Sequence, residues 1–273
     1  MNWPVSVIIV THNSAQVLPR CLEALDRQTM PVERIVIVDC GSTDTTYLES
    51  LQNKNDLVLL KTDNIGFGKA NNLGLASIKQ LSGMILFLNP DTFVYSDSIV
   101  RASHILQNND RTGAVTGKML GFDPFLGKPT DMLDSTGIFR KWYGRWYDRG
   151  QGESDTGRYD SASVILAACG AFLFCRAEAL MSLAGRGTFD EDFFLYKEDI
   201  ELSLRLRQKG WQIIYDPALR AYHCRGWQKD RQQVPHSLRR MAAWNEVLLY
   251  RKHPSPYIIW AVLKYLLVKY LRI

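Results

Sequence analysis

Short apolar runs that end in polar, turn-forming residues recur along the first third of the chain. The four clearest runs are residues 5–10, 34–38, 57–61 and 84–88. Runs of this length that alternate with helical periodicity predict βαβ units and a parallel sheet with right-handed crossovers. The first half is therefore predicted to be a doubly wound, Rossmann-like α/β fold.

Helical spacing of three and four follows the first run, with Ser14 as a candidate N-cap. The apolar positions on this helical face are Leu18, Cys21, Leu22 and Leu25. A second helix is predicted over residues 199–209 and would end at Gly210. In open parallel sheets ligands bind beyond the carboxyl ends of the strands, and each polar cluster after an apolar run falls there.

The residue pattern changes between Phe122 and Tyr159, where glycines and aromatic residues are frequent and no helical period is evident. This segment predicts loops and hairpins laid across the sheet, which often line a substrate groove. Strands resume over residues 164–174.

Composition bounds these expectations. With 273 residues, 46% of them hydrophobic and 22% charged, the chain is an ordinary globular protein with a sizeable core. Its net charge of +5 equals the five basic residues after position 250, since the other 28 basic and 28 acidic residues cancel. The basic excess belongs to the C-terminal tail, and no nucleic-acid partner is indicated.

The five cysteines follow no CxxC spacing, which argues against a disulfide framework and a zinc site and favours a reducing compartment. The apolar run at residues 5–10 is too short for a signal peptide or a membrane span. A cytoplasmic protein is expected.

The last segment begins near Pro254 and is apolar and aromatic, interrupted by Lys264 and Lys269. A spanning helix needs about 20 mostly apolar residues, and this run is shorter. It predicts an amphipathic helix lying in the membrane interface; the alternative is a helix buried against the domain or a dimer partner.

Three positions are candidate ligand-binding residues: Asp39, Asp91 and His223. Asp39 ends a buried strand, where its carboxylate either binds a nucleotide base or caps the next helix. Asp91 follows the most hydrophobic strand and suits Mg²⁺ or Mn²⁺ bound to a diphosphate; the alternative is a turn that caps a helix starting near Tyr95. His223, taken alone, is more typical of a hydrogen-bonded structural residue than of a ligand.

Glu198 and Asp199 lie where a loop of carboxylates and aromatics turns into the second predicted helix. A helix N-terminus stabilises negative charge and keeps an aspartate ionised, as a general base requires. Ordinary acidic N-capping is the alternative.

Several enzyme classes lack their motifs. The chain has no GxGxxG between strand and helix, no P-loop, no HExxH and no GxSxG elbow. A sugar-phosphate nucleotidylyltransferase would need a glycine-rich basic loop after the first strand, which residues 11–14 do not supply. A non-catalytic membrane-associated binding module stays open but leaves the two acidic motifs unexplained.

Together the motifs resemble the family 2 inverting glycosyltransferases of the GT-A fold, within their bacterial rhamnosyltransferase-like branch. The likeness runs from about residue 4 to 227, and the order of its motifs makes it more specific than any one of them. The segments that carry it are residues 5–13, 38–44, 64–72, 88–91, 170–174 and 194–202, with Arg205.

The resemblance implies that Thr11, Asn13 and Asp39 hold the nucleoside, that Asp91 and His223 bind the metal, and that Asp199 is the catalytic base. The first acid of the family's DxD-type motif is Asn89 here, which bears on the strength of metal dependence. Further donor-binding candidates are Gly41, Ser42, Gly66, Lys69, Asn72 and Asn89. Glu198 is the second catalytic candidate, and the acceptor-binding candidates are Glu198, Trp142, Trp146 and Tyr147.

The resemblance also implies a reaction. A divalent cation, Mg²⁺ or Mn²⁺, would assist transfer of a sugar from a nucleoside diphosphate to a glycan hydroxyl, with inversion at the anomeric carbon. The expected donor is dTDP-rhamnose, with UDP-hexoses as the alternative, and the expected acceptor is a lipid-linked saccharide of cell-surface polysaccharide synthesis.

The expected organisation is a GT-A domain over residues 1–230, with a nucleotide-sugar half to about 120 and an acceptor half from 121. Residues 231–273 would form a basic, aromatic helical tail that holds the enzyme at the cytoplasmic face of the membrane.

Overall fold

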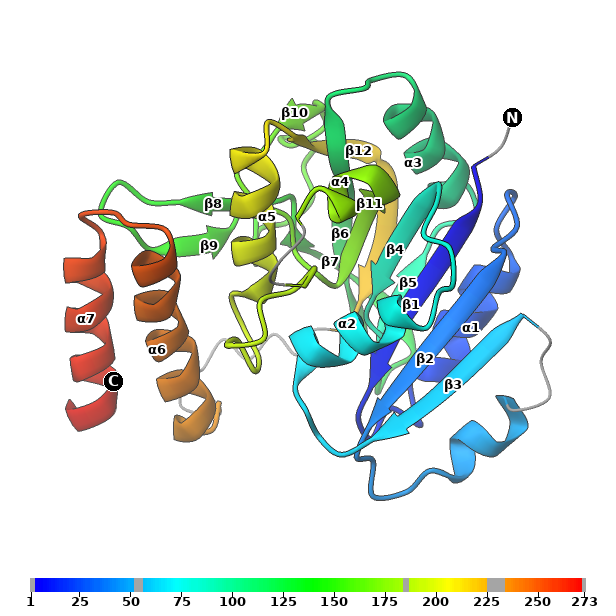
Figure 1. The fold of residues 1–273 in the computed structure, drawn as a ribbon, viewed down its shortest axis with the longest axis horizontal. Coiled ribbons are helices and arrows are strands. Elements are labelled where there is room, and N and C mark those ends of the chain that lie inside the picture. Colours follow the sequence, from blue (N-terminus) through cyan, green and yellow to red (C-terminus); the bar gives the residue numbers. More distant parts are fainter. Residues whose placement is uncertain (1–2, 52–55, 184–186, 225–233, 272–273) are drawn as a thin grey trace.

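The computed structural model describes residues 3–51, 56–183, 187–224 and 234–271. Its centre is a mixed sheet of ten strands, flanked by helices on both faces (Figure 1). Four parallel strands form the first half in the order β3-β2-β1-β4. They are β1 (Val5–Thr11), β2 (Arg34–Cys40), β3 (Leu57–Thr62) and β4 (Met84–Leu88). The predicted parallel sheet is confirmed.

Beyond β4 the sheet changes direction. The antiparallel strand β11 pairs with β4 on one side and with β6 on the other, and β12 runs parallel to β6. The strands of this half are β5 (Thr92–Val94), β6 (Thr112–Asp123), β7 (Lys128–Ser135), β10 (Ser163–Val164), β11 (Phe172–Arg176) and β12 (Gln212–His223). A separate hairpin is formed by β8 (Ile138–Arg140) and β9 (Trp146–Asp148). The segment from Phe122 to Tyr159 is thus made of hairpins, as predicted.

Alternate side chains of the central strands enter two different cores, which is why the strands read as continuous apolar runs. Val7 and Ile9 of β1 pack with the first and third helices, whereas Ile8 packs with the helices on the other face. The first layer contains α1 (Leu18–Asp26) and α3 (Ser98–Gln107). The second contains α2 (Phe67–Ala76), α4 (Ala177–Met181) and α5 (Glu198–Gln208), and a 3₁₀ helix spans Thr46–Leu51.

Two helix starts differ from prediction. The helix α1 begins at Leu18 rather than after Ser14, because the Ser14 carbonyl closes a turn with the N–H groups of Val17 and Leu18. The helix expected near Tyr95 begins at Ser98, because residues 92–94 pair with β12 as the strand β5.

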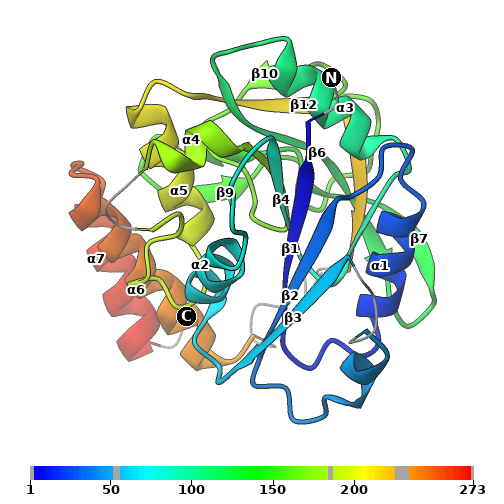
Figure 2. The same cartoon turned by 45° about the vertical axis from the view of Figure 1, so that its right-hand side comes forward.

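Two antiparallel helices, α6 (His236–Lys252) and α7 (Ile258–Leu266), lie side by side in both views (Figures 1 and 2), and Figure 1 shows them next to β8 and β9. A π-helical turn at Leu267–Leu271 continues α7. The hydroxyl of Tyr250 donates to the Gly144 carbonyl, and the rings of Trp260 and Tyr143 make an edge contact at 4.9 Å. In the described parts of the chain, none of the helices combines the length and apolar character needed to cross a bilayer.

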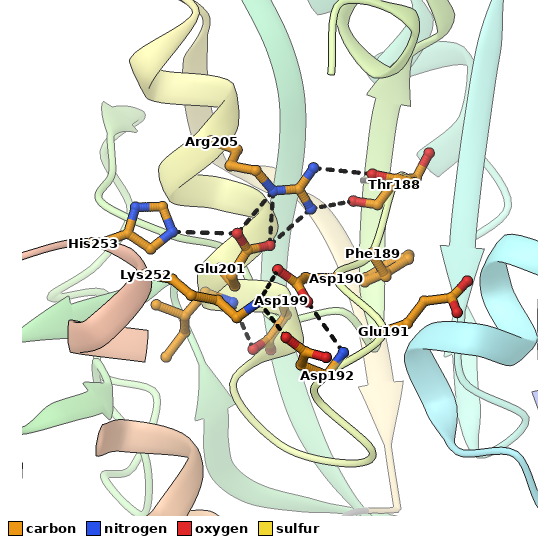
Figure 3. A network of polar contacts seen from close by, with 12 residues as sticks. Thr188, Phe189, Asp190, Glu191, Asp192, Asp199, Glu201, Arg205, Lys252 and His253 are labelled. Carbon is orange, nitrogen blue, oxygen red and sulfur yellow. Dashed lines mark hydrogen bonds and ion pairs between the residues drawn. The ribbon is translucent and has the colours of Figure 1, made fainter. Parts of the chain in front are cut away.

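A polar network connects the end of α6 to α5 and to the loop before α5 (Figure 3). Lys252 pairs with Asp190 and Asp192 at 2.7 and 2.6 Å, and the His253 imidazole lies 3.3 Å from Glu201 of α5. Burial raises the pKa of Glu201, but hydrogen bonds from His253 and Arg205 outweigh it and lower the pKa. The network therefore contains a buried ionised carboxylate with two cationic or polar neighbours.

The turn into α2 requires glycine. Gly66 has φ +87°, and a Cβ there would lie 2.5 Å from the Phe194 carbonyl oxygen, which accepts the Phe67 N–H. Gly210 has φ +88° but open space around its Cα. Both positions have a positive φ, but Gly66 combines it with ψ 163°, a region that is essentially restricted to glycine, and it also has the steric clash.

We expect Gly210→Ala to lower the free energy of unfolding by about 1–2 kcal/mol, the strain of a left-handed L-residue. Gly66→Ala should lose about 1–3 kcal/mol more, because the added methyl forces the loop at Phe194 away. Urea unfolding of both variants measures the difference. Equal destabilisation would contradict the close approach of the two segments.

Candidate active site

The carboxyl ends of β1 and β2 hold the first group of predicted residues. Thr11 and Asp39 are register partners, and the Thr11 hydroxyl donates to Asp39 Oδ1 at 3.0 Å. The hydroxyls of Ser42 and Tyr47 donate to the same oxygen at 2.5 and 3.3 Å. Within the described residues, Asp39 Oδ2 accepts one N–H, from Ser42 at 3.3 Å. This oxygen retains the capacity to accept a hydrogen bond from a ligand.

The two turns after these strands bind each other. Asn13, at φ +52°, accepts hydrogen bonds from the Thr43 N–H and hydroxyl at 2.8 and 3.0 Å, and its own N–H donates to Ser42 Oγ at 2.7 Å. Gly41, at φ +68°, lies so close to the next turn that a Cβ would be 3.0 Å from Asn64 N. The structure thus brings Thr11, Asn13, Asp39, Gly41 and Ser42 together.

The predicted residues on α2 are placed differently. Asn72 exchanges two hydrogen bonds with the Phe189 backbone, at 2.8 and 2.9 Å, and so holds the loop before α5. Lys69 is exposed. Neither side chain lines the main cavity of the site.

A carboxylate and an imidazole meet at the ends of β4 and β12. The strand β5 pairs with β12 so that Thr92 is opposite His223, and this register brings His223 Nε2 within 3.3 Å of Asp91 Oδ1. The other ring nitrogen, Nδ1, lies 2.7 Å from Oδ2 of the buried Asp134 on β7. Asp134 was not among the predicted site residues, because it belongs to no motif and lies near the end of a strand of mixed polarity.

These residues fit a divalent cation. Two ligands at right angles on one Mg²⁺ lie about 3 Å apart, close to the observed separation, and metal-binding histidines usually donate their second N–H to a carboxylate. Burial lowers the pKa of His223, but Asp91 and Asp134 raise it to about 9. The place that a cation would take lies between His223 Nε2 and Asp91, where the protonated imidazole has an N–H instead. The described residues contain no cluster of three or more His, Cys, Asp or Glu side chains suited to a metal.

The second acidic motif opens α5. Tyr196 and Lys197 both have φ +75°, a strained conformation for non-glycine residues, and they turn the chain into the helix. The N–H groups of Gly170 and Ile200 donate to the Asp199 carboxylate at 3.2 and 2.8 Å. Asp199 is therefore held in one orientation by the backbone.

The neighbouring Glu198 differs from Asp199 in its hydrogen bonding. Its Oε2 is buried and has no hydrogen-bond partner within the described residues. Burial first, and Asp199 second, raise the pKa of Glu198 to about 8. Burial also raises the pKa of Asp199, but the Gly170 N–H and Lys197 oppose this. Two backbone N–H donors favour the charged form of Asp199, whereas Glu198 Oε2 accepts no hydrogen bond within the described residues, so Asp199 is the member of the pair arranged to act as a proton acceptor.

A cavity of about 470 Å³ joins the two acidic motifs, because Asp91, His223, Glu198 and Asp199 all line it. Asn89, Trp146 and Tyr147 also line it. Trp142 does not: it is 85% exposed, and its indole contacts Tyr143. Arg145, Lys197 and Lys264 line the cavity as well. The first belongs to the loop from Arg145 to Tyr159 that was expected to face the acceptor, and the second to the motif of Glu198 and Asp199, whereas Lys264 was not among the predicted site residues.

A mixed sheet with polar residues at the ends of its parallel strands, and a carboxylate and histidine pair that shares a cavity with a second acid, is the arrangement expected of a nucleotide-sugar glycosyltransferase. Residues 3–246 match the family described as "Glycosyltransferase like family 2", and the chain belongs to this family. The family expected from the motifs is confirmed, and the protein is a glycosyltransferase.

Two curated relatives cover most of the chain. The N-acetylglucosaminyl-diphospho-decaprenol L-rhamnosyltransferase of Mycobacterium tuberculosis is 25% identical over 245 residues, 84% of this chain and 79% of the relative. Rhamnosyltransferase WbbL of Escherichia coli K12 is 25% identical over 227 residues, 80% of this chain and 83% of the relative.

Solved structures establish the fold. GalNAc-T7 with UDP, GalNAc and Mn²⁺ superposes with a TM-score of 0.68 at 17% identity, over 92% of this chain and 48% of that one. The mannosyltransferase PcManGT of Pyrobaculum calidifontis, with GDP-Man and Mn²⁺, gives 0.62 at 17% identity, over 99% and 71%. This chain spans about half of GalNAc-T7. The expected GT-A fold is confirmed.

Proposed function

We propose that the protein is a metal-dependent inverting rhamnosyltransferase, which transfers L-rhamnose from dTDP-rhamnose to a hydroxyl of a lipid-linked saccharide in bacterial cell-surface polysaccharide synthesis. The single observation that carries the proposal is the shared cavity of Asp91 and Asp199. The choice of sugar and acceptor is supported by the names of the two relatives that cover four-fifths of the chain.

In the proposed reaction Asp199 takes the proton of the acceptor hydroxyl as this oxygen attacks the anomeric carbon. The new C–O bond forms while the bond to the donor phosphate breaks on the opposite face, so the configuration inverts. Asp91 and His223 would hold the divalent cation, which neutralises charge on the nucleoside diphosphate when it is bound. Thr11, Asn13 and Asp39 would position the nucleoside.

The proposed division of labour follows the order of the motifs along the chain. Residues 1–120 bind the nucleotide sugar, residues 121–230 bind the acceptor, and residues 231–273 contact the cytoplasmic face of the membrane. The support for the last assignment is an exposed apolar side of α7 and the turn after it. Its exposed residues are Ile259, Val262, Leu263, Leu266, Tyr270 and Leu271, and Lys269 lies among them.

The proposal is tested first by the product. Incubation with a panel of dTDP-, UDP- and GDP-sugars and a lipid-linked GlcNAc acceptor should yield transfer from dTDP-rhamnose, with inverted linkage by NMR. Transfer from a UDP-hexose alone would overturn the choice of donor, and no transfer from any donor would overturn the activity.

Asp199→Asn should lower kcat by roughly 10²–10⁴ with little change in donor binding, because the general base is removed. Glu198→Gln is the matched control, since a glutamic acid that is neutral below pH 8 resembles glutamine in shape and charge. It should keep kcat at pH 7 within about threefold, a change well under 1 kcal/mol in the barrier. Equal losses in the two variants would contradict the assignment of Asp199 as base.

Asp91→Ala should abolish the Mg²⁺ or Mn²⁺ dependence of nucleotide binding. Asp134→Asn should weaken metal-assisted binding about 10–100-fold, because the second carboxylate orients His223. Asp131→Asn, an exposed change on the same strand, is the control. Calorimetric titration with dTDP and metal measures all three, and an unaltered metal response in Asp91→Ala would refute the metal site.

The double variant Ile259→Ser/Leu263→Ser should weaken binding to anionic phospholipid vesicles at least about tenfold, since each buried aliphatic side chain contributes about 1.5–3 kcal/mol. Phe125→Ser/Leu126→Ser removes two side chains that are similarly exposed, 92% and 66%, at the β6–β7 turn and should not alter binding. Vesicle co-sedimentation measures both variants. Unchanged binding of the α7 variant would remove the proposed membrane contact.

A further inference from the structure

A second cavity, of about 320 Å³, lies between the two C-terminal helices and the catalytic half. Four residues line both this cavity and the active-site cavity: Arg145, Tyr196, Ala242 and Lys264. The remaining wall is mainly apolar and consists of Val234, Leu238, Arg239, Ala243, Trp260, Leu267 and Val268. An apolar chamber thus opens directly beside the loop that carries Asp199.

The junction of the two cavities is cationic. Arg145 and Lys264 stand at the junction, Lys197 lines the active-site side, and Arg239 lines the apolar side. Burial lowers the pKa of Lys264, and the nearby charges of Lys197 and Arg145 lower it further, against the raising effect of Glu246. Lys264 pairs with the fully buried Glu246 of α6. Asp148, Glu198 and Asp199 line the active-site side, whereas the charged side chains that line the apolar cavity are all basic: Arg145, Arg239 and Lys264.

The cationic group shares the active-site cavity with Asp91 but comes from other elements than the proposed nucleoside pocket. That pocket lies at the ends of β1 and β2, whereas α6, α7 and the β8–β9 hairpin lie together beyond α5 (Figure 1). Arg145 and Lys264 come from this hairpin and from α7. They are placed to meet a ligand that approaches Asp199 from the acceptor side.

We propose that the junction binds the diphosphate of an isoprenoid-diphosphate-linked acceptor, with Arg145 and Lys264 on the phosphates and the first isoprenoid units in the apolar chamber. This inference rests on the proposed function and locates its acceptor. Cationic side chains form strong, charge-assisted hydrogen bonds with phosphate oxygens, and a chamber without charged neighbours along most of its wall suits a hydrocarbon chain. The sugar on the diphosphate would then extend toward Asp199.

The test is binding of geranylgeranyl diphosphate, followed by calorimetry, to the full-length protein. Arg145→Gln should weaken binding about tenfold or more through loss of one charged hydrogen-bond donor. Ala242→Phe, which fills the junction, should abolish it. Arg251→Gln removes the same charge from an exposed site on α6 and should leave binding unchanged.

Two further arms identify the source of the affinity. Geranylgeraniol and inorganic diphosphate should each bind far more weakly than the whole probe, and excess dTDP with Mg²⁺ should not displace it. Displacement by dTDP would place the probe in the donor site and overturn the inference, as would wild-type affinity in both Arg145→Gln and Ala242→Phe.

Binding of the probe and transfer of sugar can fail independently, so each proposal has its own test. A protein that transfers sugar to a soluble glycoside but does not bind the isoprenoid diphosphate retains its activity and loses this site. A protein that binds the probe through Arg145 and Ala242 but transfers no sugar keeps this site and loses the proposed reaction.

Discussion

The antiparallel pairing of β11 with β4 is the constraint on which the site depends. It sets Phe172 opposite Leu88, so that the Asn89 N–H donates to the Ala171 carbonyl at 3.1 Å, one residue from Gly170. The Gly170 N–H in turn donates to Asp199. One short stretch of backbone therefore connects the turn that carries Asp91 to the carboxylate on α5. Asp91 and Asp199 keep their separation because both are attached to the same end of the paired strands β4 and β11.

The loop before α5 needs support from outside the sheet, because two consecutive left-handed residues are unfavourable. That support comes from α6: the Asn245 amide donates to the Leu195 and Tyr196 carbonyls, both at 2.9 Å. Asn245 is buried, and it adjoins Glu246, the partner of Lys264. The C-terminal helices thus hold the strained backbone that aims Asp199, and the family match extends to residue 246, through most of α6.

Local sequence patterns predicted the parts of this protein that are encoded locally. The four parallel strands were predictable because both of their faces are buried, and the motifs at their ends were predictable because parallel strands present their carboxyl ends together. The approach of Asp91 to His223 depends on the pairing of β5 with β12, and β5 has three residues, too few for a periodic signal. Asp134 and Lys264 could not be predicted for a related reason, since each reaches the site through a long-range contact. The helix α6 was not predicted as a separate element, since its buried side is polar as well as apolar and includes Asn245 and Glu246.

The two C-terminal helices contact the loop before α5 on one side and expose apolar side chains on the other. Their inner side carries Asn245 and Lys264 toward the catalytic loop, while Ile259 and Leu263 of α7 are 75% and 50% exposed on the outer side. Close packing transmits displacement between such surfaces, because a filled interface has few alternative arrangements. A force applied to the outer side of α7 therefore reaches the Tyr196 carbonyl through two helices and one amide. The exposed apolar side of α7 and the loop that leads into α5 are therefore parts of one packed unit.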